Sequence, residues 1–71
     1  MSDVDLYTKV YGVALERIGS SHFTTQQRVQ MAKDIVDVLW ATSLEQSRLL
    51  YGNEEEVSKI FFTVASDLFN I

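Results

Sequence analysis

The chain has 71 residues, a net charge of −4 and no cysteine. A chain of this length forms a small core that is often reinforced by disulfides, a metal or a partner chain. The missing cysteines exclude disulfides and thiolate metal sites, and the single histidine, His22, leaves no zinc site of the usual kind. We therefore expect no metal or cofactor, and oligomerisation is the one common means of reinforcement left open.

The charge balance disfavours nucleic acids and membranes as partners. The six Lys and Arg residues are scattered among ten Asp and Glu residues, whereas nucleic-acid binders usually carry a basic face. No apolar run approaches the ~18 residues of a membrane span, and the N-terminus lacks the regions of a signal peptide. The sequence therefore predicts a cytoplasmic protein.

The first predicted element is a helix over residues 4–18. Ser2 or Asp3 can cap its first turn, and apolar side chains cover most of its circumference. Gly19 follows its last residue, where a left-handed backbone commonly ends a helix. Gly12 lies inside the helix, where it costs about 1 kcal/mol relative to alanine. It is expected to be either a surface residue or the point at which a neighbouring helix approaches closely.

The second predicted element is a long helix over residues 25–51. Thr24 and Gln27 have the spacing of a capping box. Polar residues keep one helical phase along the whole segment, although Thr42 and Ser43 are places where a helix can stop and restart. Because no Gly or Pro forces a break there, we expect one helix. A break would instead give four short helices, which could form a compact chain without a partner.

The third predicted element is a helix over residues 54–69. Gly52 ends the preceding helix, and Asn53 with Glu56 has capping-box spacing. The acidic run Glu54–Glu56 places negative charge at the positive end of the helix dipole, which gives this run a structural explanation.

These lengths predict a single all-α domain over residues 1–71, with three antiparallel helices in the order short, long, medium. Short loops make neighbouring helices antiparallel, so each outer helix covers only part of the long one. Apolar side chains then remain uncovered, which usually marks an interface. We expect a helical bundle completed by homo-oligomerisation, as a dimer or a higher oligomer. The expected interface residues are Leu6, Tyr7, Tyr11, Phe62, Ala65 and Phe69.

Catalysis is not expected. The only candidate nucleophile–base pair joins His22 with Ser20, Ser21 or Thr24 in one loop. Neighbouring loop residues seldom hold the required geometry, and no buried carboxylate is identifiable to orient the imidazole. Carboxylate pairs occur only on expected solvent faces, where nothing would raise one pKa for acid–base work.

A possible ligand site involves two tyrosines of the first helix and cations near them. Tyr7 and Tyr11 lie one helical turn apart with Lys9 between them, and Arg28 and Lys33 lie in the first turns of the second helix. A helix N-terminus favours anions, and tyrosine rings can stack on a base. An oligomer could thus hold a small anionic molecule such as a nucleotide between subunits. Core or interface aromatics with solvated cations explain the same residues.

The sequence favours a non-catalytic module that binds itself and another protein, as a regulator, adaptor or inhibitor. The alternative is an oligomer that sequesters a small anionic ligand. A further alternative is an acidic mimic of nucleic acid, for which a charge of −4 is weak support.

Overall fold

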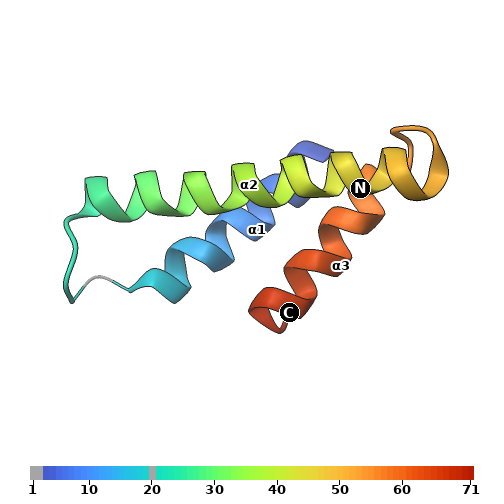
Figure 1. Ribbon diagram of the computed structural model, residues 1–71. Helices are drawn as coiled ribbons and strands as arrows, with labels where there is room; N and C mark the ends of the chain where they lie inside the picture. The colour runs from blue at the N-terminus through green and yellow to red at the C-terminus, as the bar shows by residue number, and fades with distance from the viewer. Residues whose placement is uncertain (1–2, 20) are drawn as a thin grey trace. The chain divides into compact units, whose positions relative to one another are not determined.

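The computed structural model describes residues 3–19 and 21–71, and within them the chain is all-helical, without strands. The helices are α1 (Asp3–Ile18), α2 (Thr25–Tyr51) and α3 (Val57–Phe69) (Figure 1). The sequence prediction of three helices in an all-α chain is confirmed. The expected Ser2 cap, the Asp3 side chain and Ser20 lie outside the residues and side chains that are described.

Helix α2 runs without interruption through the segment where a break was possible (Figure 1). Ser43 is buried, and its Oγ donates a hydrogen bond of 2.8 Å to the carbonyl oxygen of Leu39, one turn earlier. The Ser43 hydroxyl is therefore hydrogen-bonded within the same helix, and it does not cap the start of a new one. The prediction of one long helix is confirmed.

The chain divides into two compact units, Met1–Asp37 and Val38–Ile71, and the division lies within α2. The sequence predicted a single domain. Each unit is described below by itself.

The first unit is held by α1 and the first part of α2. Arg28 of α2 adds a hydrogen bond of 3.0 Å from its Nη2 to the carbonyl oxygen of Leu15 in α1. Their buried apolar side chains recur at helical spacing on each helix, and they are Leu6, Val10, Ala14, Ala32 and Val36. Spacing of four residues places side chains on one face of a helix, so each helix contributes one buried stripe to this unit.

The turn from α1 to α2 follows the predicted signals. Gly19 has a φ of +72°, the left-handed conformation expected after a helix. Thr24 Oγ1 accepts a hydrogen bond of 3.2 Å from the amide of Gln27, and Gln27 Oε1 accepts one of 3.0 Å from the amide of Thr24. These two bonds form the capping box that the sequence predicted.

The second unit is held by the last part of α2 and by α3. Trp40 is half-buried and meets Phe61 edge-on, with ring centroids 5.1 Å apart and an interplanar angle of 70°. The edge-on arrangement is favourable for aromatic pairs beyond the area that they bury. The buried residues of this unit are Leu39, Ser43, Ser47, Val57, Phe61, Ala65 and Phe69.

Helix α3 begins at Val57, three residues later than the sequence predicted. Asn53 does not cap the helix: its Oδ1 accepts a hydrogen bond of 3.0 Å from the amide of Glu55, only two residues on. This bond is that of an Asx turn, which competes with helix capping. Glu56 becomes the N-cap residue and makes no side-chain capping bond. The expected box of Asn53 and Glu56 is therefore replaced by a turn.

The same turn is attached to the end of α2. Gly52 has a φ of +71°, and its amide donates a hydrogen bond of 3.1 Å to the carbonyl oxygen of Arg48. Ser47 Oγ also donates a hydrogen bond to the carbonyl oxygen of Asn53. A buried hydroxyl thus satisfies a backbone acceptor of the turn, which fixes the turn against the helix.

We expect alanine at Gly12 and at Gly52 to have opposite effects on stability. A Cβ at Gly12 would meet nothing within 4 Å, so Gly12→Ala should raise the free energy of unfolding by about 0.5–1 kcal/mol through helix propensity. Gly52→Ala should lower it by about 1 kcal/mol, because a left-handed backbone is strained for alanine. Thermal unfolding followed by circular dichroism measures both, and equal signs would contradict the prediction.

Candidate functional site

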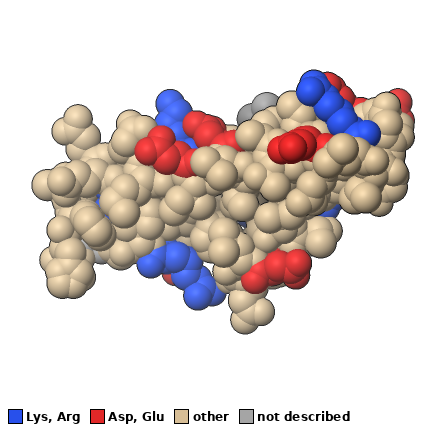
Figure 2. Space-filling view, viewed as in Figure 1, with Lys and Arg blue, Asp and Glu red and all other residues tan. Residues whose placement is uncertain are grey.

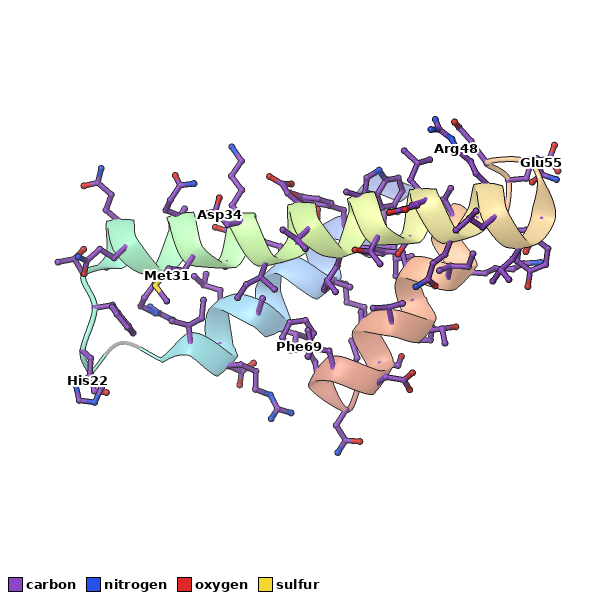
Figure 3. The ribbon with its side chains drawn as sticks, viewed as in Figure 1. His22, Met31, Asp34, Arg48, Glu55 and Phe69 are labelled. Carbon is purple, nitrogen blue, oxygen red and sulfur yellow. The ribbon has the colours of Figure 1, made fainter. Side chains whose placement is uncertain are left out.

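Metal-ligating side chains form no cluster in the described part of the chain. No group of three or more His, Cys, Asp or Glu residues there could hold a metal ion. His22 lies exposed in the loop between α1 and α2 (Figure 3). Among the helices described, none is long and apolar enough to cross a membrane.

A small open pocket of about 250 Å³ lies in the first unit. Its lining comes from one face of α1, with Tyr7, Thr8 and Tyr11, and from Lys33 of α2. Three of the five residues expected to bind a ligand therefore line one pocket. The two tyrosines lie one turn apart on α1, and both are half-buried. The pocket offers aromatic surface and one ammonium group, which suits a small flat ligand with negative charge.

Asp37 also acts on this pocket through Tyr7. Tyr7 Oη donates a hydrogen bond of 2.5 Å to Asp37 Oδ1. This bond, together with partial burial and the charge of Asp37, raises the pKa of Tyr7 to about 12. The tyrosine hydroxyl is thus neutral at physiological pH, and the carboxylate beside it offsets part of the attraction that Lys33 exerts on an anion.

The other two expected ligand residues do not line the pocket. Arg28 is half-buried, because its guanidinium group donates to the carbonyl oxygen of Leu15. Among the described residues its Nε finds no hydrogen-bond partner. Lys9 is exposed on α1 and is not among the lining residues. Arg28 therefore has a role in joining two helices of the unit.

We expect the bond between Tyr7 and Asp37 to make stability depend on pH in the alkaline range. Because the folded pKa of about 12 exceeds the ordinary value of 10.0, the bond stabilises the fold fully below pH 10 and is lost as the pH rises towards 12. Tyr7→Phe should flatten the fall in unfolding free energy over this range. Urea unfolding at several pH values measures the slope. Asp37→Asn should flatten it similarly, and an unchanged slope in both variants would contradict the prediction.

A groove of about 270 Å³ lies in the second unit, between the end of α2 and α3. Its lining residues are Gln46, Leu50, Tyr51, Glu56, Lys59, Ile60, Thr63 and Val64. Half of these side chains are aliphatic or aromatic. One acidic and one basic residue belong to the lining, and Lys59 Nζ lies 3.3 Å from Glu56 Oε2. We call this feature the α2–α3 groove.

Apolar side chains at the end of α2 extend the groove onto the surface. Leu49 is 77% exposed and Leu50 is 69% exposed, and Tyr51 is exposed beside them. The sequence analysis did not single out these residues. A signal was available, since consecutive helical residues are separated by about 100° and three apolar neighbours cannot all face one core.

The residues expected at an interface have different surroundings. Tyr7 and Tyr11 are half-buried, and Phe62 is 41% exposed. Three others are already buried within the chain: Leu6, Ala65 and Phe69. The interface prediction was wrong for these three: Ala65 and Phe69 belong to the core face of α3, which follows a spacing of four residues from Val57 to Phe69, and Leu6 belongs to the buried stripe of α1.

Figure 2 shows charged groups at several places on the face in view, with blue groups next to red ones along its upper edge. In the second unit, Arg48 Nη2 lies 2.6 Å from Glu54 Oε1, and both side chains are largely exposed. Figure 3 shows Arg48 beside the turn that follows α2. Exposed pairs of this kind add little to stability, up to about 1 kcal/mol, so this pair closes the turn without defining a site.

Comparison with known proteins gives no relative: no family model, curated protein or solved structure matches the chain.

Proposed function

We propose that the chain is a non-catalytic, self-associating protein interaction module, such as a regulator, adaptor or inhibitor, that acts in the cytoplasm. The observation that carries the proposal is the exposed run Leu49–Tyr51 next to the α2–α3 groove. Burying one leucine side chain contributes roughly 1.5–3 kcal/mol, and contiguous apolar surface of this kind usually marks a binding site.

We further propose that the helices run antiparallel and that copies of the chain complete the bundle. In the first unit, the bonded pairs Tyr7–Asp37 and Leu15–Arg28 have opposite order along α1 and α2. Such an order supports antiparallel helices joined by a short loop. In the second unit, the short turn after α2 supports the same arrangement.

Self-association is tested by measuring mass in solution. We expect multi-angle light scattering at micromolar concentration to give a mass that is a multiple of the 8.1 kDa of one chain. The reason is that an assembly removes the exposed leucines from water. A mass of one chain at every concentration tested would contradict the proposal.

The pocket of the first unit, which is lined by Tyr7, Tyr11 and Lys33 among others, supports a second candidate function. In this alternative the chain sequesters a small anionic molecule with a flat ring system, such as a nucleotide. The rings would stack on the ligand and the ammonium group would face its negative charge. An open pocket of this size becomes a closed site only if a second subunit covers it, so this alternative also depends on self-association.

Ligand binding is tested with a panel of nucleotides. If this alternative holds, a nucleotide raises the melting temperature by several degrees, because a ligand that binds only the folded state stabilises it. Tyr11→Ala and Lys33→Ala should abolish the shift. Lys9→Ala is the matched control, since it removes a cation of the same unit that does not line the pocket. No shift across the panel, or an equal loss in the control, would contradict the alternative.

A further inference from the structure

We propose that the occupant of the α2–α3 groove is a second copy of the same chain, related by a two-fold axis that places Lys59 of each copy against Glu56 of the other. This inference rests on the proposed self-association and assigns a surface to it. It follows from the apolar residues of the groove and from the charges on its rim.

The apolar part of the groove is incomplete within one chain. Leu50 belongs to the groove and is still 69% exposed, while Ile60 and Val64 of α3 are only half-buried. Leu49, which precedes Leu50 in α2, is also largely exposed. A helix end with exposed leucines, beside a groove of which half the lining side chains are apolar, supplies both the inserting side chain and the receiving surface. In a pair of copies, the leucine of each copy can therefore enter the groove of the other.

The rim carries one charge of each sign. Glu56 and Lys59 both line the groove, three residues apart along the chain, and they form an ion pair of 3.3 Å with each other. The Lys59 side chain is still 79% exposed, so its ammonium group is also open to a carboxylate of a second copy. In a two-fold interface, a contact between residues i and j occurs twice with the roles of the copies exchanged. A rim with one acid and one base is therefore complementary to itself. A strongly basic or strongly acidic partner would meet one unfavourable charge at the same place.

The proposed pairing of Lys59 with Glu56 can be tested by reversing the charge of each residue. We expect Lys59→Glu alone and Glu56→Lys alone each to weaken self-association by about tenfold or more, because each variant places like charges opposite each other twice. An equimolar mixture of the two variants should associate again, since each acidic rim then meets a basic one. Light scattering over a concentration series measures the variants and the mixture.

Two further variants distinguish the groove from other surfaces. Leu50→Ser should weaken association, whereas Val38→Ser should not, although Val38 is also an exposed apolar residue of α2 in the second unit. Val38 is the matched control because it lies twelve residues, about 18 Å along the helix axis, from Leu50. Circular dichroism checks that every variant keeps its helices.

The outcomes separate this inference from the function on which it rests. A parent chain that stays monomeric at every concentration overturns both. A parent chain that associates while the charge variants and Leu50→Ser behave like it overturns the inference alone. Charge variants that weaken association but are not restored by mixing also overturn the two-fold pairing.

Discussion

A buried stripe along α2 is the interaction on which both units depend. Ala32 and Val36 contribute to the first unit, and Leu39, Ser43 and Ser47 contribute to the second. The two serines are small enough to leave room for packing, and their hydroxyls donate to the carbonyl oxygens of Leu39 and Asn53. A buried hydroxyl without such a bond would cost about 1–3 kcal/mol. The polar members of the stripe can therefore be buried because their hydroxyls are hydrogen-bonded.

Both units are built on the single helix α2, and this explains why apolar side chains remain exposed in each unit. Each part of α2 has one partner helix within its unit, and one helix cannot cover both flanks of another. In the second unit the uncovered flank is the α2–α3 groove with the exposed Leu49 and Leu50. In the first unit it is the pocket beside Tyr7 and Tyr11. The two candidate sites thus have one physical origin.

Local signals in the sequence were sufficient for most of the fold. The capping box of Thr24 and Gln27, the left-handed Gly19 and Gly52, and the continuity of α2 all depend on neighbours within a few residues. The predicted start of α3 was wrong because the side-chain oxygen of Asn53 can accept a hydrogen bond either from the first turn of a helix or within an Asx turn. Sequence spacing does not separate these two choices, since both use the same side-chain oxygen.

The contacts between helices could not be predicted from the sequence. Tyr7 and Tyr11 both line the pocket of the first unit, because their spacing of one turn puts them on the same face of α1. The partner of Tyr7 and the role of Arg28 depend on which residues of α2 lie opposite α1. Likewise, α3 has apolar side chains both inside and outside the buried set, and only packing selected the face from Val57 to Phe69.

The edge-on contact between Trp40 and Phe61 has a practical consequence for following the two units separately. Trp40 is the only tryptophan of the chain, and it lies in the second unit. Its indole emission therefore reports on the surroundings of one side chain of that unit, whereas the amide signal averages over all helices. Transitions that coincide in both signals would indicate that the two units unfold together. Separate transitions would indicate that α2 frays at one end while the other stays folded.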